Sequence, residues 1–384
     1  MWIPVLQNIL MYIKDKVRET YFYFINKKNR VINLVMQTKL FKIDTNNIDE
    51  ELMKEAGETV KNGGLVAFPT ETVYGLGGDG LNPSSSEKIY KAKGRPSDNP
   101  LIIHIADIND LDKIVKEVPE KAMKLAKAFW PGPLTMIFNK SDVVPKETTG
   151  GLDTVAVRMP NHKVALELIK HSSGYIAAPS ANLSGRPSPT KAAHVIEDMD
   201  GRADIIIDGG TSTIGLESTI VDLTGDVPMV LRPGYISIKS LSRVVGDVVF
   251  DPALVSTNEN EKPKAPGMKY RHYAPKGELV IINGSEKAVI EYIQKQSEEA
   301  LKAGERVGII ATEETYLNYK ATSVQNIGSR DDEETIAKRL YAVLREFDTD
   351  NVTRIYSEAF DTPSMGQAIM NRLMKAAGYH VITL

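Results

Sequence analysis

The sequence predicts an α/β protein of two domains, and three features of the chain support this. Its 384 residues are enough for two separate hydrophobic cores. Short apolar runs typical of buried strands occur between longer amphipathic segments typical of helices. Their order is irregular up to about residue 250 and regular beyond about residue 276. We therefore expect a twisted mixed sheet with helices packed on it in residues 39–250, and a smaller, largely parallel α/β domain in residues 276–384.

In the first domain, the spacing of apolar residues separates helices from strands. The segment 47–61 carries Leu52, Ala56 and Val60 on one face and ends at Gly63, as an amphipathic helix does. The same reasoning predicts helices at 84–92, 107–115, 120–129 and 164–170. Strands are predicted at 65–68, 101–105, 134–138, 154–159, 175–178, 205–207, 218–222 and 229–231. The stretch 70–80, rich in Thr and Gly, is predicted to be a turn.

The second domain alternates strands and helices in a way that favours a parallel sheet. Strands are predicted at 278–282, 306–311, 323–327 and 352–356, and helices at 286–303, 333–347 and 366–377. Residues 251–275 between the domains are rich in proline and polar residues and have no sustained apolar period, so they are predicted to be a linker.

Residues 1–38 fit neither domain. The run from Met1 to Ile13 contains no charged residue, but 13 residues are too short for a membrane span, which needs about 20. No basic segment precedes the run and no small-residue cleavage site follows it, so a signal peptide fits poorly. We expect an N-terminal extension outside the fold; an interfacial helix is the alternative.

Composition excludes several classes of site. The formal net charge of −3 argues against a broad basic surface for nucleic acid. The absence of cysteine excludes disulfides, thiolate zinc sites and cysteine nucleophiles. The six histidines lack metal-ligand spacing, so no metal site built by the protein is expected. We expect a cytoplasmic protein with no membrane partner.

Cationic and hydroxyl side chains gather at the ends of the predicted elements. Lys93 and Arg95 follow helix 84–92, where Gly94 and Pro96 stop it. Hydroxyls and further arginines stand at strand ends: Thr70, Thr72, Thr154, Ser180, Ser188, Ser218, Arg158 and Arg232. Open α/β sheets bind ligands at such ends, and arginine holds carboxylate and phosphate with two hydrogen bonds. The pattern therefore indicates a site for an anionic ligand.

Simpler interpretations exist for the same residues. Taken alone, Lys93 and Arg95 also fit solvated cations at a helix C-terminus, which carry little core packing. Ser180 and Asn182 also fit ordinary turn formers after Pro179. The sequence has no Walker A motif and no strict dinucleotide-binding glycine motif.

Five motifs follow one another along the first domain: PTETVYGLG at 69–77, KGRP at 93–96, PSANLSG at 179–185, STIVD at 218–222 and LRPG at 231–234. In this order they resemble the motifs of the YrdC-type threonylcarbamoyl-AMP synthases. The resemblance covers roughly residues 43–245. The segment PGMKYRHYAP at 266–275 is similar to the linker of the long, two-domain form of this enzyme. The resemblance implies a YrdC-like catalytic domain in residues 39–250.

It also implies a reaction, in which L-threonine, bicarbonate and ATP give threonylcarbamoyl-adenylate and pyrophosphate. Mg²⁺ is the implied cofactor, held by the ATP phosphates. Other proteins would transfer the threonylcarbamoyl group to tRNA; direct tRNA binding by this chain is left open. The catalytic residues implied are Lys93, Arg95, Ser180 and Asn182. Threonine would be bound by Thr72, His104, Arg158 and Ser218, and ATP by Arg95, Asn99, Thr154, Ser180, Ser188, Arg232 and Tyr273.

The chemistry of the residues agrees with these roles. A carbamate that attacks the α-phosphorus is an anion approaching an anion, and Lys93 and Arg95 can offset that repulsion. Arg158 is the cation we expect for the threonine carboxylate. Aromatic residues between Pro266 and Pro275 suggest that the linker covers the site, with Tyr273 near the phosphates; a linker that only docks the second domain is the alternative.

Two other functions remain open. Related modules of hydrogenase-maturation proteins form carbamoyl-adenylate, but those proteins carry acylphosphatase and zinc-finger segments, for which this chain has neither the length nor the cysteines. A non-catalytic RNA-binding module would bind RNA in a salt-dependent manner without adenylate chemistry.

Overall fold

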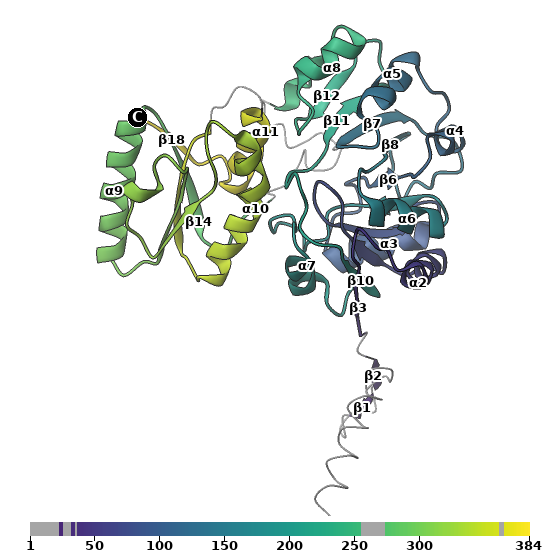
Figure 1. The fold of residues 1–384 in the computed structure, drawn as a ribbon, viewed down its shortest axis with the longest axis horizontal. Helices are drawn as coiled ribbons and strands as arrows, with labels where there is room; N and C mark the ends of the chain where they lie inside the picture. The colour runs from purple at the N-terminus through teal and green to yellow at the C-terminus, as the bar shows by residue number, and fades with distance from the viewer. Residues whose placement is uncertain (1–22, 26–31, 35–36, 255–272, 361–364) are drawn as a thin grey trace, which may run out of the picture.

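The computed structural model describes residues 23–25, 32–34, 37–254, 273–360 and 365–384, which form one α/β domain around each of two large sheets (Figure 1). A two-stranded antiparallel pair, β1 (Tyr23–Ile25) with β2 (Ile32–Leu34), precedes them. Most of the predicted extension, residues 1–38, and most of the predicted linker, residues 251–275, lie outside the described residues.

The first sheet has eleven strands that pair in both directions, which confirms the predicted mixed sheet. In spatial order they are β13 (Val249–Phe250), β12 (Met229–Arg232), β11 (Thr219–Asp222), β7 (Leu134–Asn139), β8 (Thr154–Arg158), β6 (Ile102–His104), β9 (Ile176–Ala178), β5 (Gly75–Asp79), β4 (Val66–Phe68), β10 (Ile205–Asp208) and β3 (Lys39–Lys42). Parallel pairs such as β6 with β8 stand beside antiparallel pairs such as β6 with β9. Of the predicted site residues, His104 ends the central strand β6, and Ser180 closely follows the central strand β9.

Seven helices of the described residues belong to this domain. They are α2 (Glu50–Lys61), α3 (Pro83–Lys93), α4 (Leu111–Ile114), α5 (Glu120–Phe129), α6 (Lys163–His171), α7 (Ala192–Met199) and α8 (Ile238–Val245). Of these, α2, α3, α5 and α6 correspond to predicted helices. Asn82 caps α3 by accepting a hydrogen bond from the backbone N–H of Ser84, and Pro83 occupies the first turn. Gly94 ends α3 in the left-handed conformation, with φ 60°. These two caps set the position of Lys93 and Arg95.

The predicted turn at 70–80 contains a strand, β5, which corrects the sequence interpretation. Its glycines are required by packing and not by a turn. A Cβ atom at Gly77 would lie 2.7 Å from Ile176 Cγ2 and 2.8 Å from Phe68 Cε1. Because β5 pairs with both β4 and β9, the absence of side chains lets neighbouring strands close over it.

The C-terminal sheet is entirely parallel, with the order β16 (Ser323–Asn326), β15 (Val307–Ala311), β17 (Arg354–Glu358), β14 (Glu278–Asn283) and β18 (Val381–Thr383). Helix α9 (Glu286–Lys302) covers one face, and α10 (Glu333–Thr349) and α11 (Gly366–Ala376) cover the other (Figure 1). Along β14, Leu279 and Ile281 pack toward α10 and α11, whereas Val280 and Ile282 pack toward α9. This confirms the predicted parallel α/β domain.

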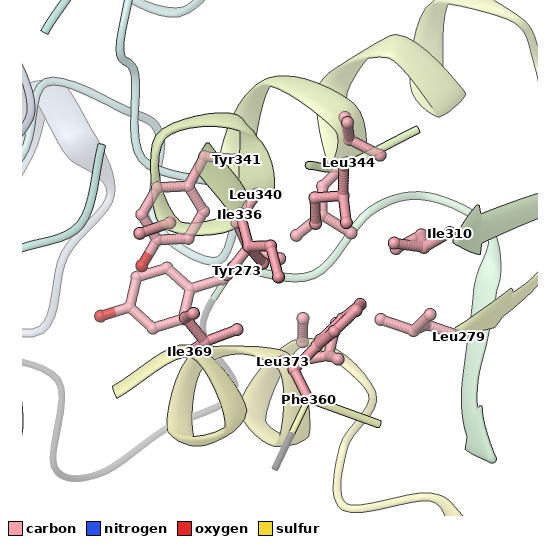
Figure 2. Close-up of a cluster of buried hydrophobic side chains, with 14 of the residues drawn as sticks. Tyr273, Leu279, Ile310, Ile336, Leu340, Tyr341, Leu344, Phe360, Ile369 and Leu373 are labelled. Atoms are coloured by element: carbon pink, nitrogen blue, oxygen red, sulfur yellow. The ribbon is translucent and has the colours of Figure 1, made fainter. Parts of the chain in front are cut away.

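The core beside α10 and α11 extends into the first domain (Figure 2). Val73 and Leu216 of the first domain belong to the same buried cluster as Leu340 and Ile369 of these two helices. Tyr273, where the described chain resumes after residue 254, lies with its ring 5.0 Å from that of Tyr341. The two domains are therefore joined by apolar packing.

Several elements were not predicted: β3, α7, α8, β13, β18 and the 3₁₀ turns η2 (Ile108–Asp110), η3 (Pro252–Leu254) and η4 (Tyr316–Asn318). The predicted helix 107–115 is split into η2 and α4, because the side chain of Asp107 accepts from the N–H of Asn109 and starts a tight turn there. None of the helices in the described ranges is both long and apolar enough to cross a membrane.

Candidate active site

A pocket with about 700 Å³ of space between its atoms, partly open to solvent, lies among the predicted motifs. It is lined by Thr70, Thr72, Val73, Tyr74, Gly75, Lys93, Arg95, Ile102, His104, Arg158, Ala178, Pro179, Ser180, Asn182, Ser184, Glu217, Ser218, Arg232 and Tyr273. Residues from all five motifs, from Thr70 to Arg232, thus meet in one cavity, together with His104 and Tyr273. The cavity brings hydroxyls, cations and backbone amides together.

One wall is the loop between β4 and β5, which buried hydroxyls hold in shape. Thr70 Oγ1 donates to the carbonyl of Val73 (2.6 Å) and accepts from the backbone N–H of Thr72 (3.2 Å). The hydroxyls of Thr70 and Thr72 also lie within hydrogen-bond distance of each other, 2.9 Å. Such side-chain to backbone bonds stabilise a turn without regular structure. Thr72 is thereby fixed at the pocket wall.

Lys93 is buried, so the interpretation of a solvated helix-end cation is wrong for this residue. Its Nζ donates to the carbonyl oxygens of Ser180 and Asn182, both at 2.5 Å. Burial, and then the charge of Arg95, hold the pKa of Lys93 well below its usual value. An ammonium group has three N–H donors, so a further donor can serve a ligand, and an anionic ligand would favour the charged form.

Arg95 is only partly buried and donates from Nε to the carbonyl of Asn99 (3.2 Å) and from Nη2 to that of Pro100 (3.0 Å). Burial lowers its pKa to about 10, so it is charged at neutral pH. Neither Lys93 nor Arg95 forms an ion pair with a carboxylate in the part of the chain that the structure describes. Among the described residues, Lys93 and Arg95 are therefore held at the pocket by backbone carbonyls and are not neutralised by a directly paired carboxylate.

The Ser180–Asn182 turn is held against β5 and α3. Ser180 forms a bridge with Gly75, and Ser180 Oγ donates to Asn182 Oδ1 at 2.5 Å. The amide nitrogen of Asn182 donates to the carbonyls of Leu183 (2.8 Å) and Arg186 (2.9 Å). These bonds account for the turn-forming interpretation, and the same residues also line the pocket, so the two interpretations are compatible.

Arg158 is not an isolated cation, because the buried carboxylate of Glu71 lies 2.7 Å from its Nη2. It also donates from Nη1 to Thr72 Oγ1 (2.9 Å) and from Nε to the carbonyl of Gly132 (3.3 Å). The contact with Glu71 is an ion pair without hydrogen-bond geometry, so among the described residues only two of the five guanidinium N–H donors form hydrogen bonds. Three remain for a ligand such as a carboxylate. The sequence analysis did not identify Glu71, although it lies inside the first motif.

His104 lies at the end of β6, beside Arg158 across the β6–β8 pair. Burial, followed by the positive charge of Arg158, lowers its pKa to about 3. Its Nδ1 lies 3.1 Å from the carbonyl of Ile102, and its ring packs edge-on against Phe68. The imidazole is therefore neutral at physiological pH and has one donor and one acceptor nitrogen.

Ser218 directly precedes strand β11, and Arg232 is the last residue of the neighbouring strand β12. Arg232 donates from Nη2 to Ser218 Oγ (3.1 Å) and from Nε to the Ser218 carbonyl (3.0 Å). The Ser218 hydroxyl is also 2.7 Å from the hydroxyl of Thr135. This links the predicted threonine-binding Ser218 directly to the predicted ATP-binding Arg232.

Three predicted ATP-binding residues, Asn99, Thr154 and Ser188, are not among the lining residues. Asn99 follows the KGRP motif and is buried, and its Oδ1 has no hydrogen bond within the described residues. Thr154 begins β8, whereas the pocket residue Arg158 ends it. Ser188 is buried and donates to Glu217 (2.6 Å), which does line the pocket. Their assignment to ATP stays a prediction.

Glu217, which lines the pocket, is another residue that the sequence analysis did not identify. It directly precedes the STIVD motif, which is the signal that was available. Burial would raise its pKa, but Arg372 and Arg232 outweigh burial and lower it to about 2. Among the described residues no group of three or more histidine, aspartate or glutamate side chains forms a metal cluster.

Comparisons with known proteins agree with this arrangement. A family model described as telomere recombination matches residues 58–234, and one described as the C-terminal domain of threonylcarbamoyl-AMP synthase matches residues 236–378. A threonylcarbamoyl-AMP synthase from Pyrococcus abyssi is 48% identical over 335 residues, which are 87% of this chain and 96% of that relative. One from Bacillus subtilis is 48% identical over 351 residues, which are 90% of this chain and all of that relative.

A solved structure of the P. abyssi Sua5 protein in complex with L-threonine has the same fold, with a TM-score of 0.86 at 46% identity. The match covers 90% of this chain and 100% of that chain. All five motifs around the pocket fall within the first matched family region, and the two regions together span most of both domains. The chain therefore belongs to the threonylcarbamoyl-AMP synthase family of enzymes, in its two-domain form.

Proposed function

We propose that the pocket converts L-threonine, bicarbonate and MgATP into threonylcarbamoyl-AMP and pyrophosphate. The observation that carries this proposal is a single cavity lined by the cations Lys93 and Arg95, whose hydrogen-bond partners among the described residues are backbone carbonyls. The same cavity is lined by neutral and paired polar groups. The relative of known structure was solved with L-threonine, which supports the substrate. The Mg²⁺ would enter with the ATP phosphates, so it is part of the substrate.

Threonine is proposed to bind among Thr72, His104, Arg158 and Ser218. Because Glu71 offsets the charge of Arg158, the threonine carboxylate would be held by hydrogen bonds from the remaining N–H donors of Arg158 and not by a bare positive charge. The neutral ring of His104 can accept from the threonine hydroxyl. A site that hydrogen-bonds this hydroxyl rejects an analogue without it more strongly than an apolar pocket does.

The other end of the pocket is proposed to hold the phosphates. The threonine nitrogen attacks the carbon of bicarbonate, and water leaves to give a carbamate. An oxygen of the carbamate then attacks the α-phosphorus, the bond from that phosphorus to the bridging oxygen breaks, and pyrophosphate leaves. Lys93 and Arg95 would stabilise the negative charge that builds up on the phosphate oxygens. The Ser180–Asn182 turn positions the Lys93 ammonium through its carbonyls. No covalent intermediate with the protein is needed, so positioning carries the rate.

Tyr273 supports part of the predicted linker role. It lines the pocket, and the N–H of the next residue, Ala274, donates to the carbonyl of Gly185 (2.8 Å). The other residues of the predicted cover lie outside the described residues, so that role stays a prediction. We further propose that the product passes to threonylcarbamoyl-transfer proteins that modify tRNA, and that this takes place in the cytoplasm.

The test is pyrophosphate release from MgATP by the full chain, with threonine and bicarbonate omitted in turn. Release should require both, and threonylcarbamoyl-AMP should be identified by mass. 2-Aminobutyrate, which lacks the hydroxyl, should be a much poorer substrate than threonine. Pyrophosphate release that needs carbamoyl phosphate in place of threonine and bicarbonate would favour the carbamoyl-adenylate alternative. Salt-dependent RNA binding without any turnover of ATP would favour the RNA-binding alternative.

A further inference from the structure

A short segment of the first domain, residues 214–218, lies between the pocket and the C-terminal domain. On the pocket side, the N–H groups of Ile214 and Gly215 donate to the carbonyls of Glu71 (2.8 Å) and Thr72 (3.1 Å). On the other side, a Cβ at Gly215 would lie 2.5 Å from the Cα of Lys338 in α10. The backbone of α10 therefore packs directly on the segment that carries Glu217 and Ser218 into the pocket.

The carboxylate of Glu217 links the two domains. Its Oε2 accepts from the Tyr341 hydroxyl of α10 (2.7 Å) and from Arg372 Nε of α11 (3.1 Å). Its Oε1 accepts from the Ser188 hydroxyl (2.6 Å). Arg372 is completely buried and is held in turn by the carbonyl of Pro233, next to Arg232.

This arrangement compensates a charge that is unfavourable for the proposed substrate. Glu217 is ionised and lines a pocket that is proposed to bind a polyphosphate. An uncompensated carboxylate there would repel the phosphates at short range and low dielectric. The guanidinium of Arg372 offsets this charge, and the Tyr341 hydroxyl fixes the orientation of the carboxylate, which leaves its other oxygen facing Ser188.

We propose that Arg372 and Tyr341 of the C-terminal domain are positioning residues for the ATP end of the pocket, and that they act by neutralising and orienting Glu217. This inference rests on the proposed use of the pocket for ATP. It gives the C-terminal domain a role in substrate binding, although neither residue lines the pocket. Arg372 and Tyr341 both act by holding the carboxylate of Glu217. The position of this carboxylate in turn sets the position of the Ser188 hydroxyl that donates to it.

The test uses the full chain with the substitution Arg372→Gln. The KM for MgATP should rise by about tenfold or more, while kcat and the KM for threonine change by less than about threefold, because the lost compensation acts on the bound phosphates. Arg372→Lys should restore part of the affinity. The double substitution Glu217→Gln with Arg372→Gln removes both charges and should bring the KM for MgATP back to within about threefold of the unmodified protein.

Tyr341→Phe tests the same inference without a buried charge, since it removes one hydroxyl and keeps the ring against Tyr273; we expect a rise in the KM for MgATP of about threefold. Arg354→Gln is the matched control, because Arg354 pairs with Glu278 and Glu305 within the C-terminal domain. It should leave both KM values unchanged.

A lower kcat with an unchanged KM for MgATP in Arg372→Gln and Tyr341→Phe would overturn the inference, since that pattern reports only a loss of correctly folded enzyme. A double variant no better than Arg372→Gln alone would also overturn it. Equilibrium binding of MgATP to the same variants separates the two proposals. Unchanged binding contradicts the inference, whereas absence of threonine-dependent pyrophosphate release in the unmodified protein contradicts the proposed function.

Discussion

Two groups of cations in this protein have partners of opposite kinds, uncharged in one group and negatively charged in the other. In the pocket, Lys93 and Arg95 are held by backbone carbonyls. Between the domains, Arg345 and Arg372 are held by the carboxylates of Asp198 (2.6 Å) and Glu217 (3.1 Å). A carbonyl orients a cation without neutralising it, whereas a carboxylate offsets its charge. The first group is therefore suited to anionic substrates, and the second to holding the domains together.

The largest effect that this comparison predicts is on activity. Arg95→Ala should lower pyrophosphate release by about 100- to 1,000-fold, the usual cost of one lost electrostatic contact to a transition state. The melting temperature should change little, because Arg95 is only partly buried and contacts neighbouring carbonyls. Steady-state rates and thermal unfolding of the same preparation check both.

Lys91→Ala is the matched control, because Lys91 is an exposed cation two residues before Lys93 in the same helix. It should retain full activity. Near-normal turnover of folded Arg95→Ala would contradict the role of the pocket cations. Lys93→Ala is a less clean test, because the substitution also removes the two bonds to the Ser180–Asn182 turn.

The second prediction concerns stability. Arg345→Ala removes the partner of buried Asp198 and two bonds to the carbonyl of Pro187. Removal of one member of a buried pair costs about 3–5 kcal/mol, and here we expect about 2–3 kcal/mol because Arg186 remains on Asp198. This corresponds to a melting temperature lower by roughly 5–10 °C.

For comparison, Arg354→Ala breaks only partly exposed pairs with Glu278 and Glu305 and should cost less than about 1 kcal/mol. If Arg345→Ala and Arg354→Ala melt at the same temperature, the interdomain pair of Arg345 with Asp198 contributes no more to stability than the partly exposed pairs of Arg354.

The third prediction is a pH dependence caused by His104. Burial and Arg158 lower its folded pKa to about 3, whereas the unfolded chain titrates near 6.5. Between these values the unfolded state binds more protons, so stability falls as the pH decreases, by at most about 1.4 kcal/mol per pH unit. Urea unfolding at pH 7, 6 and 5 measures this slope.

His104→Asn should flatten the slope even though it lowers stability overall. His194, whose pKa burial and then Arg345 lower to about 4, is present in both proteins, so the difference isolates His104. An identical slope in the two proteins would mean that His104 is protonated in the folded state.

The smallest effect is expected at the N-terminus. Removal of residues 1–37 should leave activity unchanged and lower the melting temperature by less than about 5 °C, because this segment shows no motif and no place in the pattern of either domain. The cut retains Thr38, whose hydroxyl donates to the carbonyl of Ala203 (2.7 Å). Removal of residues 1–42 is the contrasting variant, since it deletes β3 and exposes β10. Equal melting temperatures would show that β3 adds nothing to the sheet.

The sequence by itself was enough to predict most of the fold and most of the residues that line the pocket. Helix α5 has the predicted bounds, and α3 ends at Gly94 as predicted, because apolar period and caps are local properties. The motifs also contain Lys93, Arg95, Ser180 and most of the other residues that line the cavity. The exceptions among the local patterns, such as β5, arise where packing against strands distant in sequence decides the conformation.

Only the tertiary structure decided which of these charges are compensated. Arg158 is paired with Glu71, 87 positions earlier, and Glu217 with Arg372, 155 positions later. Neither partner is signalled by spacing, because contacts between residues so far apart depend on how the sheet and the two domains come together. A sequence can therefore identify an arginine as a candidate ligand-binding group, but the fold determines whether its charge is available to the substrate.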